Sequence, residues 1–397
     1  MLERIPSEHA EKATDCVERA RRVAPLVAQA AARVEAERQI PQDVLAALHE
    51  ARLFRLLIPR TYGGEEVAPA EFVAAVEEIA KADASTAWCI AQGSGCSMAA
   101  AYLEPSVARA VFGNDDAVMA SGPSTADARA VVTDGGFRVT GTWMFASGSR
   151  NSFWLAGHCT LCEADGTPRR TADGKSVERT MIFPKSSATI TDVWQVMGLK
   201  GTGSDNYAVT DLFVPAEYSF TRESAADRRE MGPLYRFTSL NIYGFSFAGV
   251  ALGIARSILE DFKQLAQTKK PHASNKVLRE NAAIQSGVAL AEARLRSSRA
   301  FLFETMRDLW QVASAGESFT LEQRAQMRMS STYAIQQARE IVEFAYHAAG
   351  ATAIFESQPF ERRLRDMHAV SQQVQGHAAN FEGVGQVLLG LQPSGKL

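Results

Sequence analysis

The chain reads Gly135-Gly136-Phe137-Arg138-Val139-Thr140-Gly141-Thr142-Trp143-Met144-Phe145 at the point where its pattern changes. This stretch opens at a glycine turn and then alternates apolar with polar side chains, which is typical of a half-buried β-strand. Further strands are predicted over 128–133, 152–159, 179–183, 188–197 and 207–214. Because no helical pattern separates them, residues 117–215 are predicted to form an antiparallel barrel or sandwich rather than a parallel sheet.

Helical patterns flank this strand-rich segment on both sides. Helices are predicted over 11–38, 41–51, 69–81 and 85–102, and again from about Leu240 to Leu389. One long helix carries an apolar stripe at three- and four-residue steps, as a bundle member does; it comprises Ile284, Val288, Ala291, Leu295, Leu302, Met306 and Leu309. The fold class is therefore mainly α with a central β domain, divided into an N-terminal helical domain (1–115), a β domain (116–225) and a C-terminal helical bundle (226–397).

Composition excludes several classes of protein. A chain of 397 residues is expected to hold at least two hydrophobic cores. A formal net charge of −3 gives no basic field, so nucleic acid and anionic membranes are not expected partners. The start of the chain has no secretory pattern, and the longest apolar run, Ile242 to Ala255, is too short to span a bilayer and is predicted to be a buried helix. Five cysteines, an odd number, indicate reduced thiols and a cytoplasmic protein.

Three familiar motifs fail on their context. Gly93-Ser94-Gly95 lies inside a helical pattern, so it is not a dinucleotide fingerprint. The glycine-rich stretch 198–203 leads into a strand rather than a helix, so it is predicted to be a turn. Cys159 and Cys162 form a CxxC without a second pair, and the histidines are scattered, so packed thiols and no metal site are expected.

Four motifs in order resemble the acyl-CoA dehydrogenase superfamily over nearly the whole chain. They are Phe54–Pro59 with Tyr62-Gly63-Gly64, Gly141–Gly148, Met197–Ser204 with Phe213-Val214-Pro215, and Ala349–Thr352 with Pro359–Asp366. Within the superfamily, three short stretches look more like the two-component flavin monooxygenases, such as the oxygenase components of 4-hydroxyphenylacetate 3-hydroxylases. These stretches are Ser85-Thr86-Ala87-Trp88, Phe145-Ala146-Ser147-Gly148 and Gly201-Thr202-Gly203-Ser204.

The resemblance implies a fold, a reaction and partners. The fold would be an N-terminal helical domain, an antiparallel β-barrel or sandwich and a C-terminal four-helix bundle, assembled as a homotetramer. The reaction would be hydroxylation of a small substrate, for which an aromatic ring is a candidate, with O₂ and reduced flavin, either FMN or FAD. A separate flavin reductase would supply that flavin as a transient partner.

The resemblance also assigns catalytic positions. Superfamily dehydrogenases usually carry a glutamate base shortly after the Arg-Asp pair, but residues 367–376 contain no carboxylate. The histidines of the better-known oxygenases fall here near Cys96 and Gln373, which leaves His368 as the nearest substitute. At helical spacing His368 would share one polar face with Ser371, Gln372 and Gln375, and that face could equally be a solvated or intersubunit surface.

Flavin contacts are implied at four places. Phe145, Ala146 and Ser147, with Trp143 in the same motif, match the segment that passes the flavin ring, and Ser147 is also a catalytic candidate. Ser121 and Pro123 match a second flavin-edge segment. His347, Gly350 and Ala351 match a segment that approaches a neighbouring subunit's flavin, and Lys269 falls near a phosphate-binding position.

Each of these residues could instead be ordinary packing. Three interpretations therefore stay open: a reduced-flavin-dependent monooxygenase, which is favoured, a flavoprotein that oxidises an acyl-CoA or related thioester, and a non-catalytic ligand-binding scaffold of the same fold.

Overall fold

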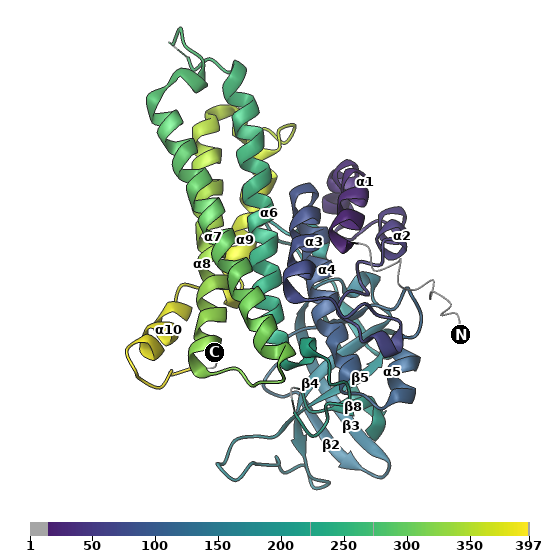
Figure 1. The fold of residues 1–397 in the computed structure, drawn as a ribbon. Helices are drawn as coiled ribbons and strands as arrows, with labels where there is room; N and C mark the ends of the chain where they lie inside the picture. Colours follow the sequence, from purple (N-terminus) through teal and green to yellow (C-terminus); the bar gives the residue numbers. More distant parts are fainter. Residues whose placement is uncertain (1–14, 223, 273, 396–397) are drawn as a thin grey trace, which may run out of the picture.

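The computed structural model describes residues 15–222, 224–272 and 274–395, in which helices, a sheet and a helical bundle follow one another along the chain (Figure 1). The N-terminal helices are α1 (Cys16–Glu37), α2 (Gln42–Glu50), α3 (Pro69–Ala82), α4 (Ala84–Ser97) and α5 (Pro105–Phe112). The helices predicted over 41–51 and 69–81 are confirmed. The helix predicted over 85–102 ends early, because residues Met98–Ala101 tighten into a 3₁₀ turn. Residues 11–14 of the first predicted helix lie outside the described part.

Eight strands of the described residues form one sheet. They are β1 (Met119–Ser121), β2 (Arg129–Thr133), β3 (Gly136–Ala146), β4 (Trp154–Cys162), β5 (Glu178–Pro184), β6 (Thr189–Thr191), β7 (Asp205–Pro215) and β8 (Ser219–Phe220). The order is β6-β7-β3-β2-β4-β5-β8, with β1 also on β4. The prediction of a purely antiparallel sheet is wrong at two pairs, since β1 and β2 both run parallel to β4. The cause is topological: after the β2–β3 hairpin the chain crosses to the other side of β2 before it forms β4.

The strand predicted over 188–197 is mostly a folded turn. Only Thr189–Thr191 pairs with a neighbouring strand. Beyond it, Asp192 forms ion pairs with Arg38 at 2.6 Å and Arg150 at 3.2 Å, and the Trp194 indole donates to the Leu199 carbonyl at 3.0 Å. These contacts draw the segment away from the sheet and toward α1, and the stretch that follows is the predicted glycine-rich turn.

The C-terminal helices are α6 (Ser239–Thr268), α7 (Ala282–Ser314), α8 (Leu321–Ala349), α9 (Phe360–Gln372) and α10 (Asn380–Leu388). The predicted stripe on α7 is confirmed from Ala291 to Leu309, where its members are buried. In the described part of the chain, α6 is the one helix long and apolar enough to cross a membrane, and 89% of that window is buried inside the protein. This agrees with the prediction of a buried helix over 242–255.

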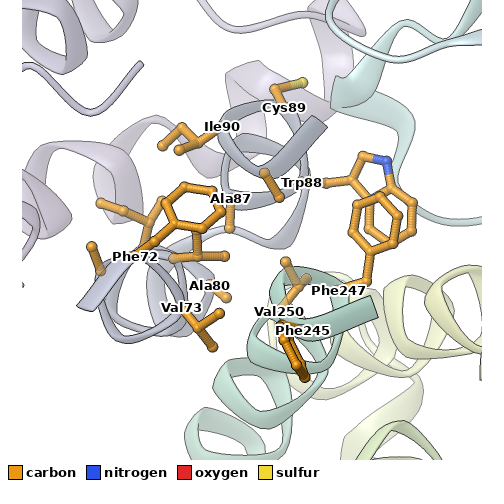
Figure 2. Packing of buried hydrophobic residues seen from close by; sticks show 14 of the residues in the cluster. Phe72, Val73, Ala80, Ala87, Trp88, Cys89, Ile90, Phe245, Phe247 and Val250 are labelled. Carbon is orange, nitrogen blue, oxygen red and sulfur yellow. The ribbon is translucent and has the colours of Figure 1, made fainter. Parts of the chain in front are cut away.

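The part of the chain that the structure describes has two hydrophobic cores, but they do not follow the three segments. The sheet has its own core, whereas the N-terminal helices and the bundle share the other one. The two helical segments join where α3 meets α6, so closely that a methyl group at Gly253 would lie 2.5 Å from the Ala80 side chain. The Trp88 ring of α4 stacks on Phe247 of α6 at 3.8 Å between centroids and 3° between planes (Figure 2). This packing fixes α4 between the sheet and α6.

Candidate active site

A chain of buried hydroxyl groups connects the second and third motifs with α4. Ser147 lies just beyond the end of β3, and the Trp88 indole Nε1 donates to its Oγ at 3.1 Å. Ser147 Oγ and Ser204 Oγ are 2.7 Å apart, and Ser204 Oγ is 2.7 Å from Thr202 Oγ1. Thr202 Oγ1 donates to the Leu199 carbonyl at 2.8 Å. All three hydroxyl residues are buried, so the order of their hydrogen bonds is fixed by the protein.

The number of hydrogens in this series of hydroxyl groups decides whether Ser147 offers a ligand a donor or an acceptor. A hydroxyl has one hydrogen and two lone pairs. Because Thr202 gives its hydrogen to Leu199, Ser204 must donate to Thr202 and Ser147 must donate to Ser204. Ser147 also accepts from Trp88, so one lone pair on its Oγ is left. Ser147 therefore presents an acceptor to a ligand.

The backbone beside Ser147 is held in an unusual conformation. Phe145 has φ +54° and Leu199 has φ +52°, a left-handed region that bulky side chains seldom adopt and that often marks functional sites. As a result the Phe145 ring is turned outward, 57% exposed, with its edge toward Trp194 at 6.0 Å between centroids. Ser147 itself is only 7% exposed. An open apolar surface thus lies next to a nearly buried hydroxyl.

Two neighbours in the same motif point away from this surface. Ala146 is buried. Trp143 is fully buried in the core of the sheet, where its indole donates to the His158 carbonyl at 3.0 Å and stacks on Tyr207. The expectation that the Trp143 side chain contacts a cofactor is therefore corrected: alternation along β3 turns this ring to the inner face of the sheet.

One face of α4 leads from Ser147 to a cavity. Trp88, Gln92 and Cys96 are four residues apart and so lie on the same side of the helix. The Gln92 amide donates to the Ser121 carbonyl at 3.3 Å, and it lies 3.7 Å from Cys96 Sγ. Cys96 Sγ is 3.3 Å from the Tyr243 hydroxyl, and burial raises the pKa of its thiol. Cys96 is thus a buried residue whose neutral thiol form is favoured.

The cavity holds about 390 Å³ of space, part of it open to solvent. It lies where α4, the sheet and the start of α6 meet. Its wall includes Cys96, Met119, Ser121, Thr180, Phe220 and Arg222. Two of the predicted site residues, Cys96 and Ser121, therefore line one cavity.

A polar group that the sequence did not predict stands at this wall. His158 Nδ1 is 2.8 Å from Thr180 Oγ1, while its Nε2 faces the Arg222 guanidinium and lies 3.4 Å from Ser121 Oγ. Burial, followed by the Arg222 charge, holds the pKa of His158 well below its ordinary value. Neither the β4–β5 pairing that aligns His158 with Thr180 nor the position of the segment after β8 can be read from the sequence.

The predicted catalytic residues of the last helices lie elsewhere. Helix α9 ends at Gln372, so Gln373 and Gln375 are outside it, and the predicted face that His368 shares with Ser371, Gln372 and Gln375 is wrong at Gln375. His368 Nε2 faces Glu343 of α8 at 3.9 Å. Gln373 Oε1 accepts the Gln375 amide at 2.6 Å and so caps a 3₁₀ turn. Neither His368 nor Gln373 lines the cavity.

A second group of predicted residues lies at the far end of the bundle. Lys269 Nζ donates to the Ala349 carbonyl and to Thr352 Oγ1, the latter at 2.7 Å, which places it beside Gly350 and Ala351. His347 lies in the last turn of α8 nearby. Helix α6 has 30 residues and therefore spans about 45 Å between its cavity end and this end (Figure 1). A single chain does not bring this group to Ser147 or Ser121.

The remaining flavin-edge candidate lies with the first group. Pro123 follows β1 and has an exposed side chain, while its carbonyl accepts the Met144 amide at 3.0 Å. Ser121, Pro123, Phe145 and Ser147 thus gather at one side of the sheet. The residues predicted to contact the flavin fall into two separate groups, one on the sheet and one at the end of the bundle.

Known proteins resemble this chain in sequence and structure. Residues 10–105 match the family described as acyl-CoA dehydrogenase, N-terminal domain, and residues 245–378 match its C-terminal domain. An indole-3-acetate monooxygenase of Pseudomonas putida is 31% identical over 358 residues, which cover 90% of this chain and 89% of the relative. An FADH₂-dependent resorcinol hydroxylase, oxygenase component, of a Rhizobium species is 27% identical over 393 residues, 94% of each chain. The crystal structure of 3-HSA hydroxylase from Rhodococcus sp. RHA1 has 25% identity and a TM-score of 0.87, and covers 96% of this chain and 98% of its own.

Proposed function

We propose that this chain, which belongs to the acyl-CoA dehydrogenase family and is a flavin-dependent monooxygenase within it, acts as the oxygenase component of a two-component enzyme that hydroxylates a small aromatic compound. The observation that carries the proposal is the single free lone pair on Ser147 Oγ beside the open Phe145 surface. The names of the relatives support the reaction type and the aromatic class of the substrate.

The hydroxyl chain fits a reduced flavin better than an oxidised one. A reduced flavin carries a hydrogen on N5, whereas an oxidised flavin has an acceptor there. Ser147 Oγ would accept that hydrogen, and Phe145 with Trp194 would offer apolar surface to the ring. When bound, the reduced flavin supplies the two electrons with which O₂ gives one oxygen atom to the substrate and one to water.

The protein's own contribution is to hold this edge and exclude water. The buried order Trp88, Ser147, Ser204, Thr202 keeps the acceptor in one orientation before any ligand arrives, which avoids reorganisation on binding. The cavity would hold the aromatic ring of the substrate, and the neighbouring parallel rings of Trp88, Phe247 and Tyr243 stiffen its wall.

The proposal includes an assembly and a partner. Lys269, Gly350 and Ala351 would complete the flavin site of a neighbouring copy, in a homotetramer. Exposed Ile354 (63%) and Phe355 (59%) beside them support this role, because such apolar side chains are usually covered. A separate reductase would deliver the reduced flavin. A cytoplasmic location is also proposed, and five unpaired thiols support it.

Anaerobic titration with reduced FMN and reduced FAD, followed by mixing with ¹⁸O₂, tests the function. The expected result is tight binding of one reduced flavin and, with an aromatic substrate present, one ¹⁸O atom in the product. Binding of oxidised FAD that survives purification, with no ¹⁸O in the product when reduced flavin is added, would contradict the proposal.

A further inference from the structure

We infer that the cavity selects aromatic substrates that carry a carboxylate, and that Arg222 is the residue that recognises this group. The inference takes the aromatic class and the site from the proposed function and adds the charge of the substrate. It depends on three features of the described residues: the charge balance of the wall, the way Arg222 is held, and the position of the arginine relative to Ser147.

The charge balance of the wall favours an anion. Among the described residues that line the cavity, Arg222 is the one with a formal charge, and the others are apolar or neutral hydroxyl and thiol groups. No described carboxylate lies within 4.0 Å of its guanidinium, whose recorded polar contact is with His158. A ligand that brings a carboxylate would give this partly buried cation a counter-ion that the described residues do not supply.

The arginine is held in one orientation from behind. A guanidinium has donors but no acceptor, so His158 Nε2 must accept from Arg222. The His158 hydrogen is then on Nδ1, from which it donates to Thr180 Oγ1 at 2.8 Å. The lowered pKa of His158 agrees with this neutral form. His158 is a positioning residue: it uses one of the five N–H donors and leaves the fork of Arg222 for a two-point contact with a carboxylate.

The position of Arg222 also orients the substrate. Ser121 lies between the two parts of the site, since its Oγ approaches His158 and its carbonyl accepts the Gln92 amide of α4. Gln92 lies one helical turn from Trp88, which contacts Ser147. A substrate whose carboxylate binds Arg222 would therefore point its aromatic ring toward α4 and the flavin edge. An aryl acetate, with its acid one carbon from the ring, has this shape.

Calorimetry with indole-3-acetate and the neutral indole-3-acetamide tests the inference. Both ligands are titrated anaerobically into the protein, with and without saturating reduced flavin. We expect the wild type to bind the acid about 10- to 100-fold more tightly than the amide, which is what a hydrogen-bonded charge pair contributes. Arg222→Gln should remove this preference while it keeps the affinity for the amide. Arg222→Lys keeps the positive charge but not the two-point contact of the guanidinium, so it should keep part of the preference for the acid.

A matched control is Arg170→Gln, in the exposed loop between β4 and β5, where Arg170 donates to the Gly174 carbonyl. It should keep the full preference. The inference is wrong if the wild type binds both ligands equally, if it binds neither, or if Arg222→Gln weakens both to the same extent. Failure of the proposed function is a separate result, because the flavin and ¹⁸O₂ experiment uses the wild type and needs no preference for acids.

Discussion

The Leu199 amide donates a 2.7 Å hydrogen bond to the Asp366 carboxylate, which is 167 positions further along the chain. Beside it the Arg365 guanidinium donates to the Met197 carbonyl at 2.6 Å. A methyl group at Gly198 would lie 2.1 Å from the Arg365 carbonyl, so only glycine allows this approach. The Arg-Asp motif of α9 therefore holds the loop that carries Thr202 and Ser204, and through them it positions Ser147.

The first prediction concerns pH. Burial, with repulsion from Asp83, raises the pKa of Asp366 to about 7. In the unfolded chain an aspartate has a pKa of about 3.9. The folded protein thus binds this proton more tightly than the unfolded chain does. The resulting contribution to the free energy of unfolding is complete below about pH 4 and is lost as the pH rises through about 7.

Asp366→Asn keeps an acceptor for Leu199 and removes the charge. The melting temperature of the variant relative to wild type should therefore rise from pH 5 to pH 8, which thermal unfolding at the two pH values measures. Asp134→Asn, at an exposed position, is the control and should show the same difference at both. An equal difference at both pH values in Asp366→Asn would show that Asp366 is already ionised without penalty.

The second prediction concerns Ser147. Ser147→Ala removes the free acceptor, and since a neutral hydrogen bond contributes about 0.5–1.5 kcal/mol, affinity for reduced flavin should fall by about tenfold at most. The release of hydrogen peroxide per O₂ consumed should rise more, because the flavin edge is no longer held during the reaction with oxygen. Peroxide yield with an aromatic substrate present measures this, because without substrate every O₂ consumed already ends as peroxide. Ser149→Ala is the control. The Ser149 hydroxyl donates to the Gly203 carbonyl and is not part of the series of hydroxyl groups formed by Ser147, Ser204 and Thr202. An unchanged yield in Ser147→Ala would mean that Ser147 only stabilises the end of β3.

The third prediction separates two roles of Trp88. Trp88→Phe keeps a ring against Phe247 but loses the Nε1 donor, so the free energy of unfolding should fall by about 0.5–1.5 kcal/mol. Trp88→Ala also removes the stack and should cost about 3–5 kcal/mol. Urea denaturation of both variants measures the difference. Equal losses would show that the stack contributes nothing beyond the hydrogen bond.

The fourth prediction concerns thioester oxidation. No described carboxylate lines the cavity, and residues 367–376 contain none, so no base is placed to remove an α-proton. Oxidation of straight-chain acyl-CoA with an artificial electron acceptor should be negligible. Turnover of about 1 per second or more, which is ordinary for enzymes, would show that a base acts from outside this cavity.

The parts of the site that the sequence predicted are those that short motifs encode. Ser147 follows a strand with clear alternation, and Cys96 is on a helix whose register is readable, so both could be placed. Gln375 could not, because nothing in Ser371-Gln372-Gln373 marks the end of α9, and an assumed extra turn put it on the wrong face.

Arg222 and His158 show a different limit. Their contact depends on two strands pairing across 22 positions and on a loop that returns to the sheet 64 positions after the histidine. Both are long-range events that periodicity does not encode. The parallel pairs of β4 were missed for the same reason, since the order of strands in space depends on a crossover rather than on any one strand.

The common core of α3 and α6 has a consequence for biosynthesis. The apolar face of α3 packs against α6, which lies more than 150 positions later in the chain. During synthesis the whole sheet segment must therefore leave the ribosome before this face is covered. The sheet is in effect an insertion into a discontinuous helical domain. Fragments that end after β8 would leave the α3 face open to chaperones or aggregation, and the slow step of folding would be the return of α6, since closing so long a loop is what slows folding.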